Sequence, residues 1–524
     1  MASGLFSVGT SGLSAAYAAI QTTSHNITNA ATPGFKRQQT IQSTPPAQFS
    51  GSGFIGQGVT VETIRRAYSE IISKAADAAV SRASEASTKS DYLQRLDRLL
   101  GDPNTGIGAA LDRFFNSLQA AAAKPEDSAG RAVFVDQTRI LSSRIAQGAS
   151  EIEILRTDAA RDLSLSIKNA NDYGRQIAGL NDRIAVALAS GQPPNDLLDQ
   201  RDAAIRNLSS EIGVSTFVQD DGAISVFLGN GQTVIAGGQF NSLVVSNDPN
   251  DAAKKAIGVQ TPNGFLYVGN SGSIFSGGNI ASLLNIHNRD LIGAKAELGR
   301  LALSVATPLN TQHQRGLDAD GVAGGNLFTL PPAQVVSSVN NTGNAVIGLA
   351  IADSTALKAS DYRLQYDGVN YSVVREQDGV TQSFAALPAT LDGVTISIQS
   401  GVLAAGDVFT LKPVSTRADA LSSAIIDLRK LALALPVFAS ASASNTGSLS
   451  VDAVTVSATP NVNLQQPVTL TFTSPTTFDV SGTGTGNPTG LTYTPGGAIS
   501  YNGWIVNLRG SPRAGDVVTV QTNP

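Results

Sequence analysis

The 524-residue sequence contains no cysteine. Disulfides, a thiol nucleophile and a thiolate-bound metal are therefore excluded as sources of stability or chemistry. Charged residues make up 15% of the chain, below the ~25% of ordinary soluble domains, and the formal net charge is −5. Because no basic stripe or run is present, the chain lacks the footprint of a nucleic-acid-binding protein, and we expect no nucleic-acid partner.

Long hydrophobic runs are also missing. No stretch approaches the ~20 apolar residues that a membrane span requires. The N-terminal residues Met-Ala-Ser-Gly-Leu-Phe provide neither the basic region nor the long apolar region of a secretory signal peptide. We therefore expect no membrane insertion, and a chain that is cytosolic or leaves the cell without a cleaved signal.

Histidine is scarce, with His25, His287 and His313 as the only three. None belongs to a His-Glu-x-x-His motif or has a second histidine nearby, so we expect solvated or helix-packed side chains rather than ligands or bases. Carboxylates are frequent in the helical segments, where we interpret them as surface charge. The sequence thus offers no pair of groups suited to acid–base catalysis.

Two short motifs match ligand sites only in part. Residues 51–56 (Gly-Ser-Gly-Phe-Ile-Gly) have the letters of a dinucleotide-binding loop, but coil precedes them and a strand is expected after them, so we predict a loop. Residues 318–321 (Asp-Ala-Asp-Gly) lack oxygen ligands at the first and twelfth positions of a calcium loop and predict an Asp-Gly turn. We therefore predict no catalytic, cofactor-binding or metal-binding residues, and a protein that is not an enzyme.

A heptad stripe occupies the N-terminal segment. Phe6, Leu13, Ile20 and Ile27 recur every seven residues, and Tyr17 lies at an intermediate seam position. Ala, Ser, Thr and Gln fill the other faces, so the helix is too polar to bury itself and requires a partner. We predict that these five side chains, the seam, form an assembly interface that packs knobs-into-holes in neighbouring subunits; an ordinary amphipathic helix is the alternative.

Residues 1–67, the arm, combine this helix with an extended segment. Because an isolated polar helix is marginal in water, we expect the arm to be partly disordered in the free subunit. Residues 68–330 predict a helical shaft. An apolar stripe runs from Tyr68 to Leu100, and another runs almost unbroken between residues 127 and 188, from Phe134 to Ile184. A continuous helix over 127–188 would measure roughly 90 Å, which is typical of rods and coiled coils.

Strand patterns appear at two places. Alternating apolar residues around Asp-Asp-Gly at 220–222 and Gly-Asn-Gly at 229–231 predict a β-hairpin insertion at about 213–270. Beyond residue 331 the chain is rich in Thr, Val and Gly, and residues 396–411 resemble 505–520 at a constant offset of 109. This echo predicts two β-rich outer domains, 331–416 and 438–524, with 417–437 connecting them. The fold class is therefore α+β and multidomain: a long helical-bundle or coiled-coil shaft with small β-rich outer domains.

Residues 13–38, which include Ser-His-Asn-Ile-Thr-Asn-Ala-Ala-Thr-Pro-Gly-Phe at 24–35, resemble the N-terminal signature of flagellar axial proteins, the family of rod, hook and hook-associated subunits. Residues 56–68, 195–202 (Asn-Asp-Leu-Leu-Asp-Gln-Arg-Asp) and 309–318 are similar to the hook-associated members that join hook to filament. The resemblance covers about residues 1–330.

The resemblance implies an extracellular structural subunit that forms the junction ring between hook and filament and serves motility. It implies export by the flagellar type III system, and as partners other copies of the chain, the hook protein, the second hook–filament junction protein and an export chaperone. Another axial subunit, of the hook or rod, is the first alternative, since Phe35-Lys36 is closer to that form of the signature. A secreted β-rich adhesin or a hydrolase on a flagellar scaffold is the second.

In this family the N-terminal helix pairs with a C-terminal heptad helix to line the inner core of the tube. Only Gln-Thr-Asn-Pro follows Val520 here, so no such helix is present in the sequence. We therefore expect a fragment, a truncated gene product or an expressed segment that lacks the chaperone site and cannot join a filament.

Overall fold

The computed structural model describes residues 2–49, 51, 53–189, 191–457, 461–484 and 486–523. The chain divides into two compact units. The first unit contains residues 1–97, 153–292 and 336–341, and the second contains residues 98–152, 293–335 and 342–524. Among the described helices, none is long and apolar enough to cross a membrane.

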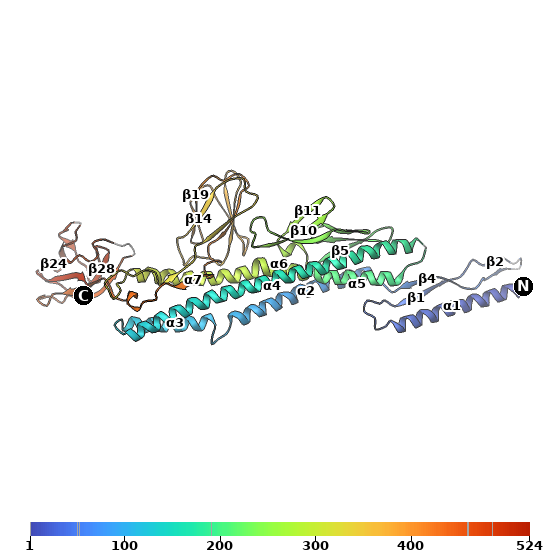
Figure 1. Ribbon diagram of the computed structural model, residues 1–524, viewed down its shortest axis with the longest axis horizontal. Helices are drawn as coiled ribbons and strands as arrows, with labels where there is room; N and C mark the ends of the chain where they lie inside the picture. Colours follow the sequence, from blue (N-terminus) through green and yellow to red (C-terminus); the bar gives the residue numbers. More distant parts are fainter. Residues whose placement is uncertain are drawn as a thin grey trace. The chain divides into compact units, whose positions relative to one another are not determined.

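The helices follow the predicted periodicity. Their bounds are α1 Ala2–Thr28, α2 Glu70–Leu100, α3 Ile107–Ala123, α4 Ser128–Leu188, α5 Asn195–Glu211, α6 Gly278–Asn285 and α7 Leu291–Gln314 (Figure 1). A π-helical turn, Ile286–Asp290, joins α6 to α7, and short 3-10 turns lie at Gly272–Ile274 and Leu428–Lys430.

The predicted long helix is confirmed. Helix α4 runs without interruption for 61 residues, about 90 Å at 1.5 Å per residue. Its predicted apolar stripe is buried at each position, from Phe134 at 1% exposure to Ile184 at 0%. Such one-sided burial is what an apolar row at helical spacing produces when neighbouring elements cover it.

The first unit also holds four small antiparallel sheets. Two belong to the arm: β1 (Gln38–Ser43) pairs with β4 (Thr60–Arg66), and β2 (Gln48–Phe49) pairs with β3 (Phe54–Ile55). The other two have the strand orders β5-β6-β7-β8 and β11-β10-β9. Their bounds are β5 Val214–Val218, β6 Ile224–Leu228, β7 Thr233–Ala236, β8 Gln239–Phe240, β9 Ser242–Asn247, β10 Lys255–Thr261 and β11 Gly264–Gly269.

The hairpin predicted near residue 220 is present as β5 and β6, and its inward residues on β6, Ile224, Val226 and Leu228, are buried. The insertion lies within the expected bounds of about 213–270 but contains more strands than a hairpin, because β7 to β11 follow. In β10 four consecutive residues, Ala256–Val259, are buried. The period-two alternation that reveals a half-exposed strand is therefore absent there.

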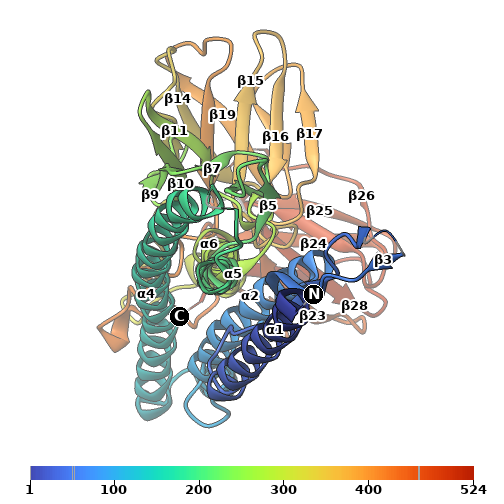
Figure 2. The same ribbon diagram turned by 90° about the vertical axis from the view of Figure 1, so that its right-hand side faces the viewer.

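The second unit contains two β-units with the same strand order. The first has a five-stranded sheet, β13-β20-β15-β16-β17, and a three-stranded sheet, β14-β19-β18; the second repeats this as β22-β29-β24-β25-β26 and β23-β28-β27. Figure 2 shows β15, β16 and β17 side by side. The two β-units thus share one topology, and each has its own core, around Leu364 and Phe409 in the first and Leu470 and Trp504 in the second.

The strand bounds of the first β-unit are β13 Gln334–Ser337, β14 Val346–Ile351, β15 Tyr362–Tyr366, β16 Tyr371–Arg375, β17 Thr381–Phe384, β18 Ala389–Leu391, β19 Val394–Ser400 and β20 Val408–Lys412. Those of the second are β22 Val437–Ala441, β23 Ser450–Val456, β24 Val468–Ser474, β25 Thr477–Ser481, β26 Leu491–Thr492, β27 Ala498–Tyr501, β28 Trp504–Arg509 and β29 Val517–Thr522. A further pair joins β12 (Phe328–Thr329) to β21 (Ser422–Ser423).

The constant offset of 109 residues is wrong for one strand of the repeat. Buried Ile396 was matched to Ile505, but the inward residue at that place in the second copy is Val506, 110 positions further on. Gln399 is the extra residue of the first copy and lies at a bulge, where β14 pairs first with Ser400 and then with Ile398. Because side chains alternate along a strand, a one-residue error exchanges the two faces.

Candidate assembly interface

Helix α1 presents its large apolar side chains to solvent. The exposed fractions are 77% for Phe6, 73% for Leu13, 62% for Tyr17, 67% for Ile20 and 72% for Ile27. The five residues of the seam therefore share an apolar stripe that the chain itself leaves uncovered. Contiguous exposed apolar surface of this kind marks interaction sites in soluble proteins. Its role as the assembly interface stays a prediction.

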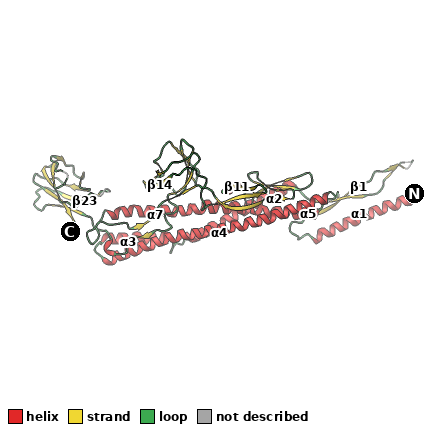
Figure 3. Cartoon of the chain, turned by 45° about the horizontal axis from the view of Figure 1, so that its top comes forward, coloured by secondary structure: helices red, strands yellow, loops and turns green. Residues whose placement is uncertain are grey.

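The opposite face of α1 is small and polar, and this is the face that packs on the rest of the arm. Ala15 and Thr22 are buried. The Asn26 side chain donates to the Gln38 carbonyl and accepts from the Gln38 N–H, each at 2.8 Å, which fixes the helix to β1. Figure 3 shows α1 beside β1. A helix of a globular domain turns its apolar face inward; α1 does the reverse.

The predicted apolar stripe of α2 also faces outward at its N-terminal end. Tyr68, just before the helix, is 41% exposed and Ile72 is 70% exposed, and Ala75 and Ala79 are exposed as well. The buried side of this helix is polar instead: Tyr92 is 3% exposed, and its hydroxyl donates to Asp162 Oδ2 at 2.6 Å. The sequence pattern identified which residues of α2 share a face, but it did not show whether the chain buries that face or leaves it exposed.

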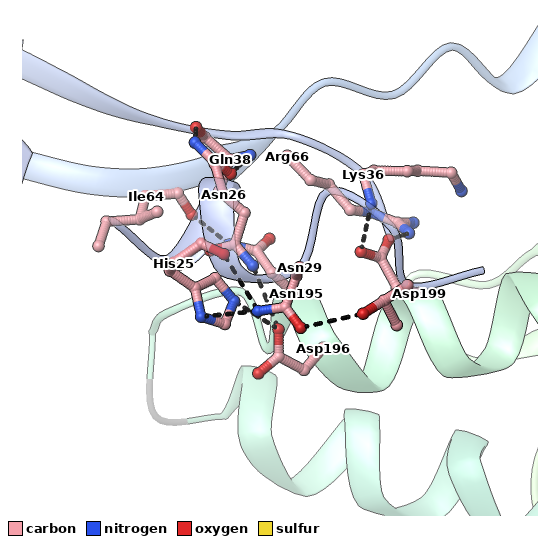
Figure 4. Close-up of polar contacts among 11 residues, drawn as sticks. His25, Asn26, Asn29, Lys36, Gln38, Ile64, Arg66, Asn195, Asp196 and Asp199 are labelled. Carbon is pink, nitrogen blue, oxygen red and sulfur yellow. Dashed lines mark hydrogen bonds and ion pairs between the residues drawn. The ribbon is translucent and has the colours of Figure 1, made fainter. Parts of the chain in front are cut away.

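A cluster of charged side chains joins the arm to α5 (Figure 4). Arg66 Nη1 donates to Asp199 Oδ1 at 2.8 Å and to Asp202 Oδ2 at 2.6 Å. The Lys36 N–H donates to Asp199 Oδ2 at 3.0 Å, and Lys36 Nζ forms an ion pair with Asp202. Two cations of the arm thus meet two carboxylates of α5.

The interpretation of helix carboxylates as surface charge is wrong for this cluster. Asp199 is 7% exposed, Asp202 9% and the intervening Arg201 3%. The two aspartates lie three residues apart, hence on one face of the helix, and each is paired there with a cation. Buried charges persist only when they are paired and hydrogen-bonded in this way. Their partners are 133 to 166 residues away in the sequence, so no local pattern identified them.

Further hydrogen bonds surround this cluster. Asn195 Nδ2 donates to the Ile64 carbonyl at 2.7 Å, and Gln38 Nε2 donates to Asp196 Oδ1 at 3.2 Å. An open cavity of about 350 Å³ lies beside them, lined by residues of the loop after α1 and of α5. His25 is on its wall, partly exposed, with Nε2 3.7 Å from Asp196 Oδ1.

Gly34 allows the close approach of the loop to α5. Its φ of +84° lies in the left-handed region, and a Cβ at this position would sit 3.2 Å from Ala203 Cβ. Glycine supplies this conformation without the steric penalty of other residues. The Thr-Pro-Gly sequence at 32–34, which follows the end of α1, therefore forms the turn that brings Lys36 to α5.

The remaining motifs take structural places. His287 and His313 are both buried, and His313 Nε2 accepts from the Ala432 N–H at 2.8 Å. Residues 318–321 form the predicted turn, with the Gly321 N–H donating to the Asp318 carbonyl at 3.1 Å. Lys430 pairs with Asp318 at 3.1 Å, which neutralises the carboxylate. Within the described part of the chain, no group of three or more His, Cys, Asp or Glu could hold a metal ion.

Three family models match the chain along its length. Residues 6–36 match the flagella basal body rod protein model, residues 93–328 match the helical domain of flagellar hook-associated protein FlgK, and residues 336–413 match a D2-like domain of flagellar hook-associated protein 1. Together with the exposed heptad arm and the long helices, these matches define the class: a structural subunit of the flagellar axis.

Similar proteins narrow the class to one family. The chain is 30% identical to flagellar hook-associated protein 1 of Salmonella typhimurium over 433 residues, which cover 81% of this chain and 77% of that protein. The protein of that name from Escherichia coli is also 30% identical, over 81% and 78%. The solved structure of the flagellar hook junction protein FlgK from Burkholderia pseudomallei superimposes with a TM-score of 0.77 at 29% identity, covering 86% of this chain and 88% of that one.

The chain belongs to the flagellar hook-associated protein 1 family. It is a structural, non-enzymatic component of the extracellular hook–filament junction, and its partners are components of the flagellar axis. The hook or rod subunit considered from the Phe35-Lys36 pair is thereby set aside, because the similarity extends through the long helices and into the first β-unit.

Proposed function

We propose that the chain assembles as a ring between hook and filament and that the α1 seam forms the contact between subunits. The observation that carries this proposal is the orientation of α1. Its seam residues are 62 to 77% exposed, whereas the small residues of the opposite face are buried on the arm. A partner that covered the seam would remove the largest side chains of the helix from water, the main favourable term in protein association.

The proposed partners follow from membership in the family. Copies of the chain would form the ring, with the hook protein on one side and the second junction protein on the other. Export would occur through the flagellar type III channel, assisted by a chaperone that recognises a C-terminal segment. A ring requires a heterologous contact, in which the seam of one subunit meets a different surface of the next, because a self-complementary contact closes as a dimer.

The test expresses each variant of the gene in a strain from which the chromosomal copy of that gene has been deleted. Ile20→Asp places a charge on the seam, and Ser14→Asp places the same charge at an exposed position of α1 outside it. We expect Ile20→Asp to abolish swimming and leave hooks without filaments in electron micrographs, because an unpaired buried charge opposes association. The strain that expresses Ser14→Asp should swim normally. Normal swimming of the Ile20→Asp strain would refute the proposed interface.

A further inference from the structure

The segment 195–202 (Asn-Asp-Leu-Leu-Asp-Gln-Arg-Asp) places three charged side chains of α5, those of Asp199, Arg201 and Asp202, in buried positions. We propose that Asp199, Arg201 and Asp202 form a hub that sets the direction of the arm and thereby positions the α1 seam. This inference rests on the proposed function of the seam. The three are positioning residues, since they act on the interface through the arm and do not touch it.

The carboxylates of the hub hold both strands of the β1–β4 ribbon at the same end. Lys36 lies two residues before β1, and Arg66 is the last residue of β4, where it pairs with Gln38. Asp199 accepts from the Lys36 backbone and from the Arg66 side chain, and Asp202 accepts from both side chains. A ribbon that is held through both strands cannot pivot about a single bond.

An aromatic ring supports the two cations. Lys36 Nζ and Arg66 Cζ each lie 4.4 Å from the centroid of the Tyr68 ring. Such cation–π contacts add attraction and restrict where the charged groups can lie. Tyr68 lies two residues before α2, so the same cluster also fixes the start of this helix relative to the arm.

Arg201 points to the other side and fixes α5 itself. Its Nη1 donates to Asn181 Oδ1 of α4 at 3.1 Å and to the Gly222 carbonyl in the β5–β6 turn at 2.6 Å. Asn181 Nδ2 in turn donates to the carbonyls of Ile224 and Gly237, each at 2.8 Å. Within the first unit, three neighbouring side chains of α5 therefore connect the arm, α4 and the hairpin.

The chemistry of the hub favours direction over stability. Replacing buried ion pairs by apolar groups often costs little stability, whereas an ion pair with fixed geometry admits few alternative arrangements. Without the carboxylates of Asp199 and Asp202, the arm would keep its internal Asn26–Gln38 hydrogen bonds. It would be held to α5 mainly by the hydrogen bonds of Asn195 to Ile64 and of Gln38 to Asp196. We therefore expect a folded arm with a wider range of directions.

The absence of cysteine makes a distance measurement direct. Spin labels are attached to Ser14→Cys in α1 and Val186→Cys in α4, both exposed positions. Pulsed electron–electron double resonance then measures the distance between the labels in the free chain, which reports the direction of the arm. The Asp199→Asn/Asp202→Asn double variant should broaden the narrow distance distribution at least twofold. Asp158→Asn, which removes a surface pair with Arg161 on α4, is the matched control and should leave it unchanged.

An unchanged distance distribution in the Asp199→Asn/Asp202→Asn variant would refute the proposal that the hub sets the direction of the arm. If that variant does not fold, as judged by circular dichroism, Lys36→Gln removes a single ion pair and should still broaden the distribution. The double variant Lys36→Asp/Asp202→Lys, which exchanges the two charges of this ion pair, should narrow the distance distribution again. The measurement uses the free chain, so its result is independent of the seam proposal. A broadened distribution with normal swimming would refute the link between arm direction and assembly.

Discussion

Replacing Leu13 by aspartate tests the middle of the seam and separates assembly from folding. Leu13 is 73% exposed in the chain, so the substitution removes at most about a quarter of the ~1.5–3 kcal/mol that a fully buried leucine contributes. We expect the free energy of unfolding to change by no more than about 0.8 kcal/mol, close to the range of most surface substitutions. The melting temperature should therefore shift by less than about 2 °C.

The same substitution has a larger effect where the seam is covered. A seam leucine that packs as a knob loses ~2–3 kcal/mol of burial when it is removed, and the carboxylate adds the cost of an unpaired charge. A total of about 3 kcal/mol or more per contact weakens association by at least two orders of magnitude. The junction should fail to form although the subunit is folded.

The assay combines calorimetry of the purified chain with incorporation into flagella. Ser14→Asp is the control for charge on an exposed, off-seam position, and Ala15→Asp is the control for the inner face, where the side chain is 3% exposed. Ala15→Asp should detach α1 from the rest of the arm and lower the helicity of α1. If Leu13→Asp lowered the melting temperature by many degrees, the seam would have to pack within the chain. The prediction that the seam is free for assembly would then be wrong.

Three further results are expected. Amide hydrogen exchange on the free chain should be faster over residues 1–60 than over 70–190, because few apolar contacts hold the arm although the hub sets its direction; equal protection of the two segments would contradict this expectation. Burial lowers the pKa of His287 to about 4, with a contribution from Arg156 and Lys255. The unfolded chain therefore binds a proton first, and the first unit should lose roughly 3 kcal/mol of stability as pH falls from about 6.5 to about 4; His287→Gln should remove this slope, and an unchanged slope would contradict the assignment. The Arg513 N–H, with those of Thr446 and Gly447, lowers the pKa of the Asp516 carboxyl. Asp516→Asn should thus lower the melting temperature of the second β-unit at pH 7 and have a smaller effect at pH 3, below the ordinary carboxyl pKa of 3.8, where the unfolded chain already takes up the proton and the stabilisation is being lost; equal effects at both pH values would contradict this role.

The sequence predicted the features that repeat at a fixed spacing. The stripe from Phe134 to Ile184 identified α4, and the turn residues around Gly222 identified the β5–β6 hairpin. The tandem β-units were found from the repeated Gly-Asp turns, in which Asp407 and Asp516 both accept backbone N–H groups. These features depend on neighbours in the sequence, so periodicity and turn chemistry were sufficient.

Features that depend on distant or external partners were not predicted. Periodicity shows which residues of α2 share a face, but it does not show whether the chain covers that face, and Ile72 is 70% exposed. Asp199 and Asp202 were misassigned to the surface because Lys36 and Arg66 lie far away in the sequence. In the β-repeat, a bulge at Gln399 shifted the register by one residue and exchanged the faces of one strand.

The most direct test of the account is the accessibility of the seam in the assembled flagellum. A cysteine introduced as Ile20→Cys, at a position 67% exposed in the chain, can be labelled with a maleimide without interference from other thiols. Val369→Cys, 72% exposed in the first β-unit, is the control. The account predicts that both react in the free subunit and that only Ile20→Cys becomes protected in isolated hook–filament junctions. Equal labelling of Ile20→Cys in the free and assembled states would contradict it.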